Sequence, residues 1–115
     1  MTAKRSIPNN VITEVLRIVD CFNQTKLKGE GSTYIPRMKG RYLYLDRDDG
    51  SMGGPGPICR LEYTGDMDEW QFEIYKYSSE RYDPEECFFP GIEYVDGTVK
   101  GALEAGMKAY PSDFF

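Results

Sequence analysis

Histidine is absent from all 115 residues of the chain. Its absence excludes Ser-His-Asp and Cys-His catalysis, imidazole metal sites and the side chain that most often serves as general base near neutral pH. Cysteine is scarce, because only Cys21, Cys59 and Cys87 occur, far apart and in no CxxC pair. This spacing argues against a disulfide framework or a zinc knuckle, and it predicts free thiols in a reducing compartment.

Long apolar runs are missing as well. The longest are a few residues long, too short to span a bilayer, and the polar first ten residues precede no apolar signal region. We therefore predict a cytoplasmic protein without membrane contact. With 40% apolar and 14% aromatic residues, the composition suffices for one core. We predict a single domain over residues 1–115, with residues 1–8 as a flexible arm.

Charge is distributed unevenly along the chain. Residues 1–47 contain nine Lys and Arg against four Asp and Glu, whereas residues 48–115 contain five against fifteen, and the net charge is −5. Such a chain could present a basic patch to a polyanion. The alternative is that the oppositely charged halves pair with each other across the fold.

Two segments show the periodicity of amphipathic helices. In residues 10–27, apolar side chains recur every three or four positions, at Ile12, Val15, Leu16, Val19 and Phe22. In residues 96–110, a similar stripe follows a possible cap at Asp96 or Thr98 and stops before Pro111. This second segment is rich in glycine and alanine, which predicts the close approach of another element.

Three segments alternate between apolar and polar residues, as half-buried strands do: 41–46, 58–63 and 69–77. Their short connections favour antiparallel hairpins. Residues 29–40 are predicted as a connection with at most a short extended piece, because Pro36 argues against a central strand. The predicted fold is α+β: a three-stranded antiparallel sheet with an N-terminal and a C-terminal helix, in the order α-β-β-β-α, and both helices cover one face.

The opposite sheet face is the most suggestive feature for function. Alternation places four tyrosines and an arginine on it, and both residue types are enriched at protein interfaces. Our leading hypothesis is a small, non-enzymatic binding protein that contacts a protein partner or a second copy of itself through Tyr42, Tyr44, Arg60, Tyr75 and Tyr77. Three alternatives remain open for these side chains. They stack nucleic-acid bases, they only stabilise the sheet, or they are covered by residues 78–94.

Two other functions remain open. A nucleic-acid-binding domain would use the basic residues of the first helix end and the following segment, which are Lys26, Lys28, Arg37, Lys39 and Arg41. A small carboxylate- or metal-dependent enzyme would use the acidic cluster Asp83, Glu85 and Glu86. The alternative for this cluster is an acidic surface loop held by the surrounding aromatic residues. We assign no catalytic residue, metal ligand or cofactor.

Overall fold

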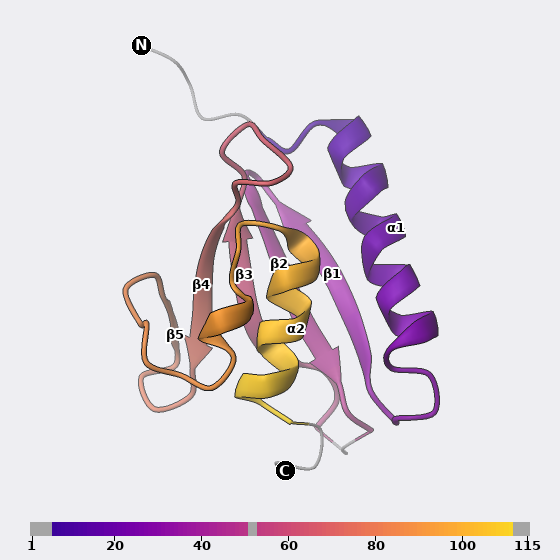
Figure 1. Cartoon of the computed structure of the whole chain (residues 1–115), viewed down its shortest axis with the longest axis vertical. Helices are drawn as coiled ribbons and strands as arrows, with labels where there is room; N and C mark the ends of the chain where they lie inside the picture. The colour runs from indigo at the N-terminus through magenta and orange to yellow at the C-terminus, as the bar shows by residue number, and fades with distance from the viewer. Residues whose placement is uncertain (1–5, 51–52, 112–115) are drawn as a thin grey trace.

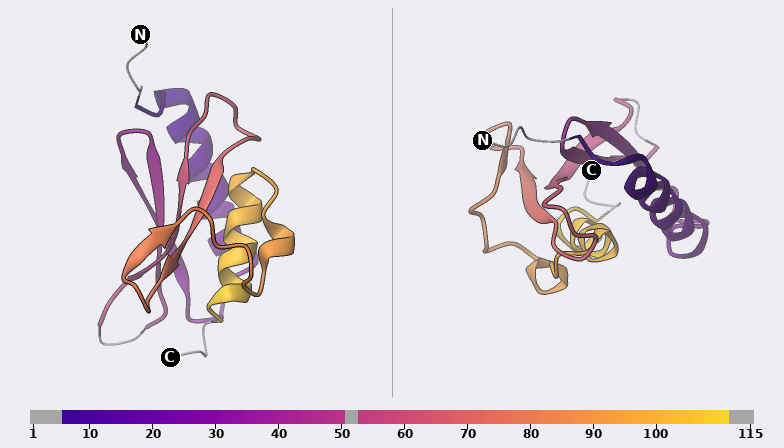
Figure 2. Two further views of the ribbon diagram at one scale, coloured as in Figure 1. Left: turned by 90° about the vertical axis from the view of Figure 1, so that its left-hand side faces the viewer. Right: turned by 90° about the horizontal axis from the view of Figure 1, so that it is seen from above.

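The computed structural model describes residues 6–50 and 53–111 (Figure 1). The described chain contains two α-helices, one 3-10 helix and five strands. In chain order they are α1 (Asn9–Thr25), β1 (Thr33–Lys39), β2 (Tyr42–Asp48), β3 (Gly56–Glu62), β4 (Gln71–Lys76), β5 (Arg81–Asp83), η1 (Ile92–Tyr94) and α2 (Val99–Ala109). The strands form one antiparallel sheet in the order β1-β2-β3-β4-β5. Both α-helices lie on the same side of it (Figure 2).

The α+β class is confirmed, but the predicted number of three strands is wrong, because β1 and β5 extend the sheet at both edges. β1 was not predicted from the sequence, because Pro36 argued against a central strand. The backbone N–H and C=O of Tyr34 bond to the Asn23 side chain of α1, at 2.9 and 3.0 Å, and so point away from β2. Since this direction alternates along a strand, the missing N–H of Pro36 falls on the open edge, where proline is tolerated.

The second missed strand, β5, has three residues, which is too short for alternation to be visible in the sequence. It pairs with β4 and places Tyr82 opposite Tyr75. The following segment then crosses to the helical side of the sheet, where η1 packs against α2 (Figure 2). Residues 78–94 therefore add an edge strand and do not fold over the opposite face.

The core lies between the sheet and the two helices. Alternation identified its strand residues well, since Leu43, Leu45, Cys59, Leu61 and Ile74 are all buried. The helices contribute a matching set, which includes Val15, Val19, Phe22, Val99 and Leu103.

Gly106 explains the small residues of α2. A Cβ atom at this position would lie 2.4 Å from the Tyr34 hydroxyl and 2.7 Å from Ile58. The Tyr34 hydroxyl, in turn, donates to the Leu103 carbonyl at 2.8 Å. The element that approaches α2 closely is therefore the sheet itself.

The first described residues are tied to this core. Ile7, within the stretch predicted as a flexible arm, is buried, and its N–H donates to the Gly40 carbonyl. Residues 1–5 of that stretch lie outside the described residues.

The Thr98 side chain caps α2 by accepting from the Gly101 N–H at 2.9 Å. Neither α-helix of the described ranges combines the length and apolar character needed to cross a membrane.

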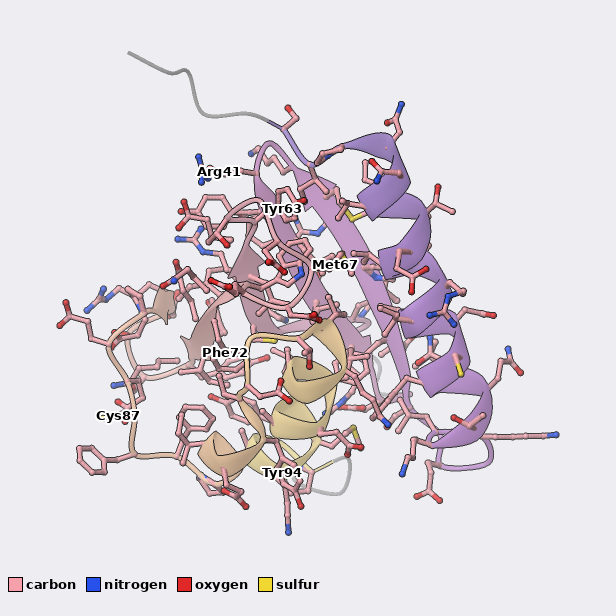
Figure 3. The ribbon with its side chains drawn as sticks, turned by 45° about the horizontal axis from the view of Figure 1, so that its top comes forward. Arg41, Tyr63, Met67, Phe72, Cys87 and Tyr94 are labelled. Carbon is pink, nitrogen blue, oxygen red and sulfur yellow. The ribbon has the colours of Figure 1, made fainter. Side chains whose placement is uncertain are left out.

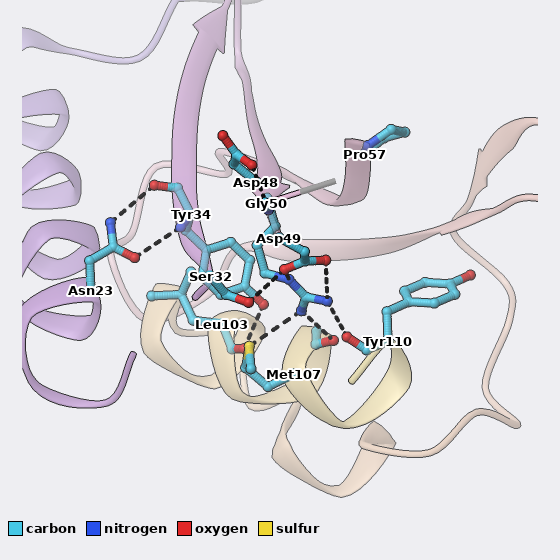
Figure 4. A network of polar contacts seen from close by, with 12 residues as sticks. Asn23, Ser32, Tyr34, Asp48, Asp49, Gly50, Pro57, Leu103, Met107 and Tyr110 are labelled. Carbon is cyan, nitrogen blue, oxygen red and sulfur yellow. Dashed lines mark hydrogen bonds and ion pairs between the residues drawn. The ribbon is translucent and has the colours of Figure 1, made fainter. Parts of the chain in front are cut away.

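A buried charged group joins β2 to the end of α2 (Figure 4). The Arg47 side chain is 0% exposed and pairs with the Asp49 carboxylate through Nε at 2.7 Å and Nη2 at 3.1 Å. Its guanidinium also donates to the carbonyls of Gly106 and Tyr110. Ser32 donates to the same carboxylate at 2.7 Å. Burial opposes ionisation of Asp49, but these hydrogen bonds outweigh it and lower the pKa of the carboxyl group.

Candidate interaction surface on the outer sheet face

The outer face is the side of the sheet turned away from the helices, and neither helix covers it (Figure 2). Each of the five strands contributes side chains to it. The register brings together the predicted Tyr42, Tyr44, Arg60 and Tyr75 with additional residues, and the members of this outer face are Ile35, Arg37, Tyr42, Tyr44, Asp46, Arg60, Glu73, Tyr75 and Tyr82. Tyr77 follows β4, and its ring contacts Tyr75 on one side and Tyr110 at the end of α2 on the other.

Arg60 is at the centre of the outer face. Its Nε donates to the Glu73 carboxylate at 2.7 Å, and its Nη1 donates to the Tyr44 hydroxyl at 3.2 Å. The guanidinium carbon lies 4.2 Å from the ring centroid of Tyr42 and 4.9 Å from that of Tyr82. Burial opposes the positive charge, but the bonds to Glu73 and Tyr44 outweigh it and raise the pKa of Arg60. The side chain is therefore held in one orientation before any partner binds.

The tyrosines pack against one another edge to face. Tyr82 lies between Tyr44 and Tyr75, with ring centroids 5.5 and 5.0 Å away. Tyr75 also contacts Tyr77, at 4.9 Å. The tyrosines therefore do pack across strands, as expected if their role were only to stabilise the sheet. The rings are nevertheless only partly buried, and Tyr77 is 41% exposed. They stabilise the sheet and present an amphipathic surface at the same time.

Three members of the outer face, Tyr82, Ile35 and Arg37, were missed by the sequence analysis because their strands were missed. Tyr82 belongs to β5, and Ile35 belongs to β1. Ile35 is a large aliphatic side chain that is 37% exposed. Nearby, the Arg37 guanidinium lies 4.5 Å from the Tyr44 ring centroid. The signal for β1 was present in the alternation of residues 33–39, but Pro36 interrupted it.

The charges of the outer face are balanced by ion pairs within it. Arg37 pairs with Asp46 at 3.1 Å, and Arg60 pairs with Glu73 at 2.7 Å. At the upper end of the sheet, Arg41 pairs with Glu62 at 2.8 Å. A polyanion binds best to cations that have no such partner. A balanced surface of tyrosine and arginine resembles a protein interface more closely.

The predicted basic group is divided between the two ends of β1. Lys26 and Lys28 follow α1 and lie near the start of β1, whereas Lys39 and Arg41 flank the turn at its end. A strand of seven residues separates these ends by roughly 20 Å. Lys26 also lies 4.0 Å from the Glu104 carboxylate. The five residues therefore do not form one continuous patch.

Lys76 pairs with two of the three carboxylates of the predicted acidic cluster, Asp83 and Glu86. The Lys76 ammonium lies 2.8 Å from Glu86 and 3.7 Å from Asp83. Its hydrogen bond lowers the pKa of Glu86, and a backbone hydrogen bond from Glu85 lowers that of Asp83. Within residues 6–50 and 53–111, no three side chains of His, Cys, Asp or Glu meet in an arrangement that could hold a metal ion.

Comparison of the chain with protein-family models, with curated proteins and with solved structures finds no match. The function proposed below therefore depends on the geometry of the described residues.

The packing of Tyr82 makes alkaline stability a test of the outer face. Burial raises the pKa of Tyr82 to about 12, from the ordinary tyrosine value of 10.0. Because its pKa is raised in the folded state, the protonated Tyr82 side chain stabilises the fold. This contribution is fully present below pH 10 and is lost as the pH rises toward 12. Over this range, we expect the free energy of unfolding of Tyr82→Phe to fall less steeply with pH than that of the wild type. The difference in slope should correspond to at most one proton. Denaturant unfolding at several alkaline pH values measures it, and an unchanged slope would show that the ring is freely hydrated.

Proposed function

We propose that the chain is a non-enzymatic binding protein that contacts a protein partner, or a second copy of itself, through the outer face. The observation that supports this best is the fixed position of Arg60 among half-exposed tyrosines. Arginine and tyrosine dominate binding energy at many interfaces, and side chains that are already ordered lose little entropy on binding.

The sheet edges support contact through the face. On β1, Asn23 occupies the backbone groups of Tyr34, and Pro36 has no N–H to offer. At the other edge, β5 is only three residues long. Short strands and proline are features that disfavour the addition of another strand. A partner that binds this sheet would therefore meet its outer face.

The two other candidate functions gain less support. Nucleic-acid binding would need the basic group to be continuous and unpaired, but the group is divided, and three of its five members, Lys26, Arg37 and Arg41, pair with carboxylates. Carboxylate chemistry would need Asp83 and Glu86 free of Lys76.

Burial raises the pKa of the Cys59 thiol, which disfavours the reactive thiolate. Cys21 and Cys87 are exposed free thiols, which suits the cytoplasmic location that we keep as part of the proposal.

A charge placed at Ile35 tests the proposal with little risk to the fold. Ile35→Glu adds a carboxylate at the margin of the outer face, whereas Leu16→Glu adds one at a similarly exposed site, 44% exposed, on α1. With each variant as bait in lysate of the source organism, we expect the wild type and Leu16→Glu to retain the same protein. Ile35→Glu should lose it, with affinity at least about tenfold weaker. Equal retention by all three baits would contradict the proposal.

Tyr44 and Tyr75 are less suitable for this test. Their rings contact Tyr82 and hold the strands together, so that alanine at either position would lower stability as well as affinity. The melting temperatures of both glutamate variants should remain close to that of the wild type, and sedimentation of each variant shows whether self-association is affected.

A further inference from the structure

Phe88 is exposed to a degree that is unusual for a phenylalanine. Its side chain is 90% exposed, and it lies in the loop between β5 and η1. The loop is held by hydrogen bonds, because the Phe88 N–H donates to the Glu86 carboxylate at 3.0 Å and Lys76 binds the same carboxylate at 2.8 Å. Ile92 and Tyr94, at 36% and 39% exposure, extend the apolar surface into η1. Exposed apolar groups on an ordered support are typical of contact surfaces.

A groove of about 450 Å³ separates α1 from the beginning of α2. Its floor is apolar and is formed by Ile18, Phe22, Met67 and Val99. Methionine adapts its shape to what it contacts, which suits a site that receives an aromatic ring. Figure 3 shows Met67 between the sheet and α1, and Cys87, the neighbour of Phe88, at the far side of the molecule.

The charges around the two features are complementary. The loop and its neighbours contain four carboxylates, Asp83, Glu85, Glu86 and Glu93, against two cations, Lys76 and Arg81, which leaves a net charge of −2. The groove is bordered by three cations, Arg17, Lys26 and Lys100, and by two acids, Glu14 and Asp68. The groove is thus net positive on a chain whose net charge is −5. An acidic, apolar loop is attracted to a groove of net positive charge.

The two features lie at opposite ends of α2. Val99 and Lys100 of the groove begin the helix, whereas Ala109 and Tyr110, at its end, line the hollow that Phe88 borders. The segment with Phe88 is on the helical side of the sheet, as the packing of η1 on α2 shows (Figure 2). A two-fold axis across the middle of α2 therefore places the Phe88 loop of each copy over the groove of the other.

We propose that the chain forms a symmetric dimer through its helical side, in which Phe88 of each copy enters the groove between α1 and α2 of its partner. Both contacts form together, so that the assembly closes at two copies. This surface is separate from the outer face, and the proposal does not depend on the function proposed above.

Sedimentation equilibrium from about 1 μM to 1 mM protein tests the dimer. We expect the wild type to dimerise, more tightly at low salt than at high salt. Phe88→Ser and Met67→Glu should each raise the dissociation constant at least about tenfold. Ile35→Glu, on the outer face, should leave it unchanged. A wild type that stays monomeric throughout would overturn the proposal.

A spin label shows which surfaces meet. Cys87 adjoins Phe88 and is exposed, whereas Cys59 is buried, so that Cys21→Ser leaves one reactive thiol. The labelled copy is mixed with an isotope-labelled wild-type copy, after its own dimerisation is shown to be unchanged. We expect intermolecular line broadening of the amides of Ile18, Met67 and Val99. Broadening confined to outer-face residues such as Ile35 would overturn the proposal and assign self-association to the outer face.

Discussion

Arg47→Met is expected to lower the free energy of unfolding by about 3–5 kcal/mol, the range for removing one member of a buried ion pair. The Arg47 side chain is 0% exposed and that of Asp49 is 8% exposed. Methionine fills much of the same volume but donates no hydrogen bond. Asp49 would keep its bond from Ser32, while the Gly106 and Tyr110 carbonyls would lose the guanidinium. The end of β2 would then be held to α2 by packing alone.

Arg37→Met is the matched control. Arg37 also pairs with an aspartate, Asp46 on the neighbouring strand, but its side chain is 51% exposed. Water replaces its hydrogen bonds, and the expected loss is below about 1 kcal/mol. Urea unfolding of the two variants at neutral pH measures both values. Similar losses would show that water reaches Arg47 in the folded protein.

The same pair predicts how acid acts on the fold. Because the folded-state pKa of Asp49 is lowered, its contribution is present above the ordinary aspartate value of 3.8 and is lost as the pH falls through the depressed pKa. In Arg47→Met this carboxyl group no longer has its strongest partner. The gap in stability between wild type and variant should therefore narrow below pH 3.8.

The spacing of residues in the sequence points to the buried position of Arg47. Leu43 and Leu45 alternate toward the core, and Arg47 continues the same spacing. The predicted strand stops at residue 46, one position before Arg47. A charged side chain is seldom fully buried without a partner. That partner, Asp49, is two residues further along. Periodicity therefore pointed to the position, while only the fold shows that its charge is neutralised.

Periodicity predicted the two helices and the three central strands, because each of these segments has one buried and one exposed side. It also placed Tyr42, Tyr44, Arg60 and Tyr75 on a common face. The ion pair between Arg60 and Glu73 was not predictable, because it depends on the register between β3 and β4. Register is fixed by the turns and by packing, and the lengths of loops alone do not reveal it.

Gly97→Ala is the other substitution with a large expected effect. Gly97 has φ of 90°, in the left-handed region, and a Cβ atom there would lie 2.4 Å from the Asp68 carbonyl oxygen. The Gly97 carbonyl also accepts from the Trp70 N–H at 2.8 Å, so that the two segments cannot separate freely. Backbone strain and overpacking together should lower the free energy of unfolding by roughly 2–5 kcal/mol.

Gly65→Ala separates the two causes. Gly65 has a similar φ of 106°, but a Cβ atom there would meet nothing within 4 Å. The decrease in the free energy of unfolding of Gly65→Ala should be limited to the backbone contribution, about 1–2 kcal/mol. Equal losses in the two variants, measured by denaturant unfolding, would show that the loop containing Asp68 moves aside easily.

Gly97 also connects stability to the proposed dimer. It precedes Thr98, and both Thr98 and Asp68 line the groove between α1 and α2. A Cβ atom that separates Asp68 from Gly97 would reshape the rim that Phe88 of the partner copy meets. We therefore expect Gly97→Ala to weaken dimerisation under conditions where it is still folded, whereas Gly65→Ala keeps the wild-type dissociation constant. A folded Gly97→Ala variant with unchanged dimerisation would show that this rim makes no contact in the dimer.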